Sequence, residues 1–185
     1  MKINLATSNN ALISIIEDPD QVITIDANFM IPPSRSQITS RSIGFEQFNG
    51  IWLDPIFTAF SNLAIHESVY EELLGSALQT YVNKKRDSIP PGIIIHTDSS
   101  LNEIERILRD TIEMKISVHT NYDPLLDNKD DRGEVKSLSY IAVKGLLYFA
   151  AHDNNAIQLI EKSKEWSTGL DNVQAIKMYE IIYYL

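Results

Sequence analysis

Short β-branched segments that alternate with long stretches of helical period most constrain the fold of this chain. The apolar segments lie at residues 22–25, 92–96 and 146–150. The stretches with helical spacing are residues 46–63, 68–82, 101–115, 134–144, 154–162 and 172–184. Nearly continuous apolar strands are typical of a parallel sheet covered on both faces. The pattern therefore predicts an α/β fold, a three-layer α/β/α sandwich with a central parallel sheet.

The chain has 185 residues, of which 44% are hydrophobic, and it contains no repeat or linker that would divide it. We therefore expect one domain over residues 1–185. The absence of cysteine excludes disulfide scaffolds, thiolate zinc sites and cysteine nucleophiles. The longest apolar run, residues 146–151, is far shorter than the roughly 20 residues that cross a bilayer. We expect no membrane interaction and a cytoplasmic location.

Net charge bears directly on the class of partner. Sixteen basic residues stand against 25 acidic ones, so the formal net charge is -9. This negative net charge argues against a protein that binds nucleic acid along a broad basic surface. The only basic run is Lys84-Lys85-Arg86.

Two acidic residues follow predicted strands. Asp26 closes the first strand, and Asp153 follows the strand near residue 150 after a short step. Ligands of open parallel sheets bind beyond the carboxyl ends of the strands, so both side chains are expected at one edge. Each acid alone could instead be a helix N-cap, and Asp131 with Glu134 has the spacing of a capping box.

Four segments in a fixed order carry a further signal. They are residues 23–28 (ITIDAN), 65–74 (IHESVYEELL), 131–138 (DRGEVKSL) and 149–154 (FAAHDN). Together they resemble the PIN domain family over residues 22–160, and residues 1–21 and 161–185 are then helical extensions. The resemblance implies an α/β/α sandwich whose acidic side chains converge at one sheet edge, bind Mg²⁺ or Mn²⁺, and cleave RNA.

The resemblance also implies roles for particular residues. Asp26, Glu72, Glu134 and Asp153 correspond to the catalytic, metal-binding acids of the family. Glu71 remains an alternative to Glu72, because it lies nearer the margin of the apolar stripe of its predicted helix. The expected supporting residues are Asn28, Glu71, Asp131 and His152. Ala151 stands where the family often has Ser or Thr, so low activity is expected.

These observations predict a metal-dependent endoribonuclease, and the resemblance leaves room for a toxin with an antitoxin partner and for a homodimer. Candidate RNA-contacting cations are Arg35, Arg41, Lys84, Lys85 and Arg86. One alternative is a PIN-like binding module without turnover. Another is a phosphatase of the haloacid dehalogenase type, which needs a second Asp where this chain has Asn28.

The four histidines offer little support for a zinc hydrolase. His66, His96, His119 and His152 lie far apart, with no pair at the spacing of a zinc site on one helix. His66 and His152 flank acids of the family pattern and could orient them, although a structural histidine is the simpler interpretation.

Overall fold

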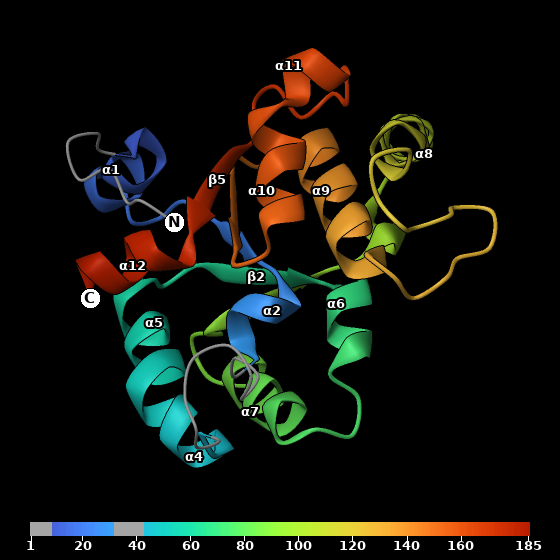
Figure 1. Ribbon diagram of the computed structural model, residues 1–185. Helices are drawn as coiled ribbons and strands as arrows, with labels where there is room; N and C mark the ends of the chain where they lie inside the picture. The colour runs from blue at the N-terminus through green and yellow to red at the C-terminus, as the bar shows by residue number, and fades with distance from the viewer. Residues whose placement is uncertain (1–8, 32–42) are drawn as a thin grey trace.

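The computed structural model describes residues 9–31 and 43–185 and is built on five parallel strands (Figure 1). The strands are β1 (Ile23–Ile25), β2 (Leu63–His66), β3 (Ile93–His96), β4 (Tyr148–Ala151) and β5 (Gln174–Lys177). They form one sheet in the order β3-β2-β1-β4-β5, and all four pairings are parallel. With helices on both faces, this arrangement confirms the predicted α/β/α sandwich.

Helices connect the strands and cover the sheet. Those before β3 are α1 (Asn10–Glu17), α2 (Ala27–Met30), α4 (Phe45–Phe48), a π-helical turn (Asn49–Leu53), α5 (Asp54–Ala59), α6 (Glu67–Glu72) and α7 (Ala77–Arg86). Those after β3 are a 3₁₀ turn (Asp98–Ser100), α8 (Glu103–Ser117), α9 (Arg132–Lys144), α10 (Asn154–Glu161), α11 (Ser163–Trp166) and α12 (Met178–Tyr184). No helix in the described ranges is long and apolar enough to cross a membrane.

Two apolar clusters sandwich the sheet, and β4 shows how they are separated. Tyr148 and Ala150 belong to the cluster that α5 and α7 cover, whereas Phe149 and Ala151 belong to the one under α9 and α10. Figure 1 shows these helix pairs on opposite sides of the sheet. Successive side chains of a strand point to opposite faces, so a strand buried on both faces must be apolar throughout.

The structure corrects three sequence-based boundaries. β5 lies inside a stretch predicted as helix, residues 172–184, and β2 begins at Leu63, the last residue of the predicted helix 46–63, where no strand was predicted. β5 also lies in the 161–185 stretch that was expected to be a helical extension. β2 forms by parallel pairing with β1 and β3, and β5 forms by parallel pairing with β4. The predicted helix 68–82 is broken between α6 and α7, where Gly75 adopts a left-handed φ of 78° and Ser76 caps α7.

Candidate functional site

Asp26 and Asp153 lie at the carboxyl edge of neighbouring strands. β1 and β4 pair in parallel, with Ile25 opposite Ala150, and the Asp26 N–H donates to the Ala150 carbonyl at 3.0 Å. Both acids are also helix N-caps. The Asp26 carboxylate accepts from the Asn28 N–H at 3.2 Å, and that of Asp153 accepts from the Asn155 N–H at 2.8 Å. The cap interpretation therefore holds for both residues without removing them from the shared edge.

Asp26 is held where a charged carboxylate is unfavourable. The residue is 4% exposed. Burial raises its pKa, bonds from the Asn28 and Ala27 N–H groups lower it, and the negative charge of Asp153 raises it, to about 6. Burial and a like charge therefore outweigh the stabilisation that the cap provides.

Glu134 is the most perturbed of the acids. It lies in the first turn of α9 and is 6% exposed, and nothing in the described residues bonds its Oε1 atom. Burial raises its pKa to about 9, with further contributions from the charges of Asp26, Asp153 and Asp131. Buried carboxylate oxygens normally accept a hydrogen bond or contact a cation. The Oε1 atom of Glu134 does neither among the described residues, and its acidic neighbours make this a candidate position for a bound cation.

The predicted capping box of Asp131 and Glu134 is wrong. Asp131 is the N-cap of α9 but adopts a left-handed φ of 55°, and its side chain makes no cap bond. Its carboxylate accepts instead from the backbone and side-chain N–H groups of Asn121, at 2.9 and 3.2 Å. Glu134 therefore does not cap the N-terminus of α9, so a purely structural capping role does not explain its position.

The structure distinguishes Glu71 from Glu72. Glu71 forms an ion pair with Arg132 at 2.7 Å, and Arg132 also bonds Asp127 at 3.0 Å. Glu72 is an exposed residue overall, yet burial of its carboxyl group raises its pKa to about 7, followed by the charge of Asp26. The Gly133 N–H and Arg132 act in the opposite direction. Glu72 is therefore the acid that interacts with Asp26.

Gly133 allows Glu72 to approach α9. A Cβ atom at position 133 would collide with the Glu72 Oε1 atom and press on Val69. Glycine in a helix interior lowers helix stability by about 1 kcal/mol relative to alanine. Gly133 lies in the first turn of α9 and leaves the space that the Glu72 carboxylate occupies.

The structure places only some of the expected supporting residues and cations near the acids. The Asn28 side chain bonds Asp26 and lowers its pKa, whereas His152 is exposed. The basic run is far from the acids, because the Gly92 N–H, just before β3 begins, bonds the Lys85 carbonyl at 2.8 Å. Lys84, Lys85 and Arg86 thus lie towards the amino edge of the sheet, opposite the acids, and their predicted contact with RNA stays a prediction. Arg35 and Arg41 lie outside the described residues.

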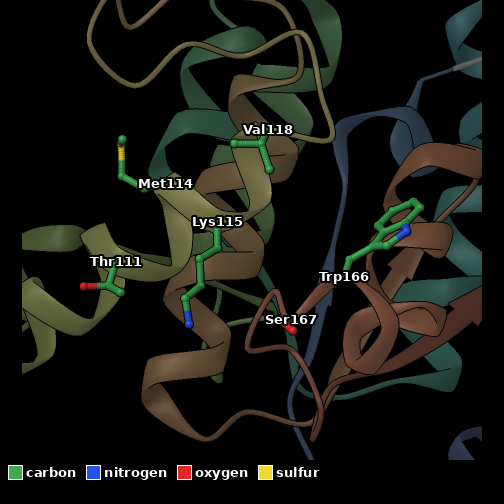
Figure 2. A pocket seen from close by; sticks show the side chains of 6 residues that line it. All are labelled: Thr111, Met114, Lys115, Val118, Trp166 and Ser167. Atoms are coloured by element: carbon green, nitrogen blue, oxygen red, sulfur yellow. The ribbon is translucent and has the colours of Figure 1, made fainter.

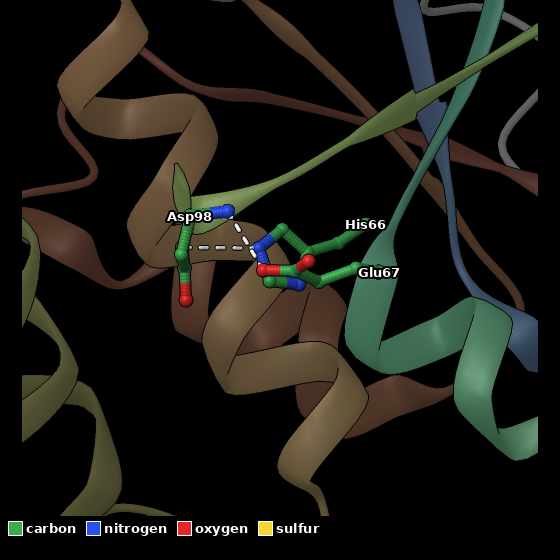
Figure 3. Close-up of side chains that lie close together, drawn as sticks. All are labelled: His66, Glu67 and Asp98. Carbon is green, nitrogen blue, oxygen red and sulfur yellow. Dashed lines mark hydrogen bonds and ion pairs between the residues drawn. The ribbon is translucent and has the colours of Figure 1, made fainter. Parts of the chain in front are cut away.

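A second polar group at the carboxyl edge was not predicted. His66 ends β2, Glu67 begins α6, and Asp98 follows β3. Each offers one ligand atom, and these atoms lie within 4.8 Å of one another, so this group could hold a metal ion (Figure 3). Within the described ranges, Asp26, Glu134 and Asp153 do not form so tight a group.

The ligand atoms of this second group are already engaged. His66 is fully buried, with Nδ1 2.7 Å from the Ser68 hydroxyl and Nε2 3.2 Å from Asp98 Oδ1. Glu67 accepts from the Asp98 N–H at 2.7 Å, and Arg109 donates to Asp98 Oδ2 at 2.7 Å. Burial raises the pKa of Asp98, but His66 and Arg109 outweigh it and the net pKa is lowered. A cation here would have to replace hydrogen bonds that satisfy these groups.

The chain gives no match to protein-family models, to curated proteins or to solved structures. The resemblance to the PIN domain family therefore stays a prediction that rests on the four sequence segments.

Proposed function

We propose that the chain is a metal-dependent ribonuclease of PIN type that hydrolyses RNA phosphodiester bonds. Its Mg²⁺ or Mn²⁺ would be held by Asp26, Glu72, Glu134 and Asp153. The observation that carries the proposal is the Glu134 carboxyl group, which is buried beside other acids and has an oxygen to which none of the described residues bonds.

The donor set fits a hard divalent cation. All four residues offer carboxylate oxygens, the ligands that Mg²⁺ and Mn²⁺ prefer. Two like charges 4 Å apart repel by about 4 kcal/mol at an effective dielectric constant of 20, so ionised acids at this edge oppose one another. The raised pKa values of Asp26, Glu72 and Glu134 are the response of the metal-free protein to that repulsion and to burial.

A bound divalent cation activates water and stabilises negative charge on a phosphate group, which supplies the chemistry of phosphodiester hydrolysis. The chain itself contributes orientation. Backbone N–H groups of α2 and α10 fix one oxygen of Asp26 and one of Asp153. Gly133 leaves room for the Glu72 carboxylate at the N-terminus of α9.

Proton release should accompany metal binding. With a pKa of about 9, the Glu134 carboxyl group holds a proton at neutral pH, and a pKa of about 6 leaves Asp26 mostly ionised. Metal ligands of this type bind in the deprotonated form, so a cation must displace the proton of Glu134. The apparent metal affinity is therefore expected to increase from pH 6 to pH 8.

The decisive experiment is a titration of RNA cleavage with Mg²⁺ and Mn²⁺, using purified protein and several single-stranded RNAs. Cleavage should require the ion and be abolished by EDTA and by Asp26→Asn or Asp153→Asn. Glu71→Gln is the matched control and should retain activity, because Glu71 is engaged by Arg132. If Glu67→Gln abolishes cleavage while Asp26→Asn does not, the ion binds at His66, Glu67 and Asp98 instead.

Ala151 favours a second candidate, a PIN-like binding module. This buried residue at the end of β4 provides no hydroxyl where the family often has one to order water. RNA binding without metal-dependent cleavage above the Asp26→Asn background would support the binding module and contradict the ribonuclease. The antitoxin partner remains a prediction that rests on the family resemblance alone.

A further inference from the structure

The outward face of α8 is apolar, and no described part of the chain covers it. Its inner face packs on α9 and buries Arg109, Glu113 and Ile116. On the outer face five large apolar side chains are between 50% and 75% exposed: Ile104, Ile107, Leu108, Met114 and Val118. Contiguous apolar patches of this kind on soluble proteins mark interaction sites.

The spacing of this face matches a helical partner. Residues 104, 107, 111, 114 and 118 follow one another at alternating steps of three and four, which is the seam by which one helix packs along another. Thr111 lies at the centre of the seam. Its hydroxyl donates to the Ile107 carbonyl at 2.8 Å, so the polar atom is satisfied within α8 and does not oppose burial.

A groove runs beside the C-terminal half of the seam. It has a volume of about 600 Å³ and is lined by Thr111, Met114, Lys115 and Val118 of α8 together with Trp166 and Ser167 (Figure 2). The Trp166 ring is held in place by the His119 ring, stacked at 4.4 Å, and by the Lys162 ammonium group, 4.9 Å from its centroid. Two aliphatic side chains of a facing helix could enter this space.

We propose that α8 is the interface of a symmetric homodimer in which two copies of α8 pack antiparallel around a two-fold axis near Thr111. The same seam on both copies then forms the interface, as a two-fold axis requires. Ile104 and Ile107 of one copy meet the Met114 and Val118 region of the other, where the groove lies. This inference does not depend on the proposed ribonuclease activity.

Charge distribution favours the antiparallel orientation. The first turn of α8 exposes Glu103, and its last turns expose Lys115. Antiparallel packing sets the acidic first turn of one helix along the basic end of the other and opposes the two helix dipoles. Parallel packing would place like charges and like helix ends side by side.

The area is consistent with a second copy of the chain. Part of the ~800 Å² that each partner buries in a standard interface comes from the four apolar side chains of the seam and the adjacent Leu108, each at least half exposed. The walls of the groove and the polar margins of α8 supply the remainder.

The test is the oligomeric state of the full chain, measured by sedimentation at about 1 to 100 µM. The wild type should form a dimer, and Ile107→Glu should raise the dissociation constant at least tenfold. Ile51→Glu is the matched control, because Ile51 is 60% exposed against 62% for Ile107 and lies on the opposite layer of helices. A wild type that is monomeric throughout, or an equal effect of Ile51→Glu, would overturn the proposal.

Because the chain has no cysteine, single substitutions can test the orientation. Thr111→Cys lies near the proposed axis and should form a disulfide-linked dimer on mild oxidation. Ile104→Cys lies two turns away, and its two copies should remain unlinked. Efficient cross-linking of both variants would indicate parallel helices, and cross-linking of neither would place the interface elsewhere; each result contradicts the proposed packing.

Discussion

Two acid-rich regions lie beside α9, and they differ in how their charges are compensated. In one, Asp98, Glu113 and Asp127 are bonded to Arg109, Arg132, Lys136 and the Tyr122 hydroxyl. In the other, the charge of Asp26 raises the pKa values of Glu72 and Glu134, and the charge of Asp153 raises those of Asp26 and Glu134. Asp98 and Asp127 have lowered pKa values, whereas Asp26, Glu72 and Glu134 have raised ones.

The difference separates acids whose ionised form stabilises the folded state from acids whose ionised form destabilises it. Ion pairs with the cations of α8 and α9 satisfy the first set within the protein. Within the described residues the second set forms no ion pair, although Arg132 lowers the pKa of Glu72, and its raised pKa values mark a free-energy cost that a bound cation would remove. Residue type alone does not reveal this distinction; the partners of each carboxylate do.

The largest expected effect comes from breaking the compensated region. Arg109→Met leaves Asp98 and Glu113 without their shared cation, and Glu113 is buried. Removal of one partner from a buried pair should lower the free energy of unfolding by about 3 kcal/mol, measured by urea denaturation. Lys144→Met is the control. It breaks a more exposed pair with Glu105 and should cost less than about 1 kcal/mol.

Metal binding should stabilise the uncompensated region. At a free-ion concentration a hundredfold above the dissociation constant, the free energy of unfolding should increase by about 2.7 kcal/mol, measured as a shift in Tm. Glu134→Gln should abolish most of this increase and should raise metal-free stability at pH 7, since the folded carboxyl group holds a proton there that the unfolded chain releases. Glu71→Gln should respond to metal as the wild type does. A full response of Glu134→Gln would place the ion elsewhere.

The metal-free protein should lose stability as the pH rises from the unfolded pKa of Glu134, 4.5, towards its folded value of about 9. Glu134 has a pKa of about 9 when folded, above its unfolded value, so the folded state binds the extra proton and releases it as the pH increases. Between pH 7 and pH 8.5 this should cost about 2 kcal/mol in EDTA, measured by urea denaturation. His96 acts with the opposite sign but only below its unfolded pKa, because burial and His66 lower its pKa to about 4. A flat profile in the wild type, or an equal slope in Glu134→Gln, would contradict this assignment.

The smallest effect on stability is expected from Gly133→Ala. The new Cβ displaces the end of the Glu72 side chain, while alanine favours the helix, so stability should change by less than about 1 kcal/mol. Metal affinity should nevertheless decrease severalfold, measured by titration calorimetry. Gly145→Ala is unsuitable as a control, because Gly145 has a left-handed φ of 66°, whereas Gly50→Ala meets open space. Unchanged affinity in Gly133→Ala would remove Glu72 from the proposed ligands.

Sequence patterns predicted the strands that are intrinsically apolar. β1, β3 and β4 are recognisable because they read as continuous β-branched or aromatic runs. β2 and β5 are four residues each and continue from stretches of helical period, so pairing with their neighbours, rather than local preference, decides their conformation. Gly75 and Ser76 were the available signal for the break between α6 and α7.

The same limitation explains which polar residues were missed. The rule that acids at the carboxyl ends of parallel strands meet at one edge located Asp26 and Asp153. Applied to β2 and β3 it would also have brought His66 and Asp98 together, but no strand was predicted at residues 63–66. The position of Lys84, Lys85 and Arg86 near the start of β3, at the opposite edge, agrees with the strand that the sequence predicted at residues 92–96.

The N-terminus of α9 depends on a side chain from another helix. Asp131 has turned away to Asn121, and the carboxylate of Glu72 lies against Gly133, whose N–H lowers the pKa of that carboxyl group. If Glu72 also coordinates an ion, its oxygens are divided between the cation and the first turn of α9. Amide hydrogen exchange at residues 132–134 then becomes a direct readout of occupancy, independent of any substrate, because protection of these amides must change when the shared carboxylate is engaged.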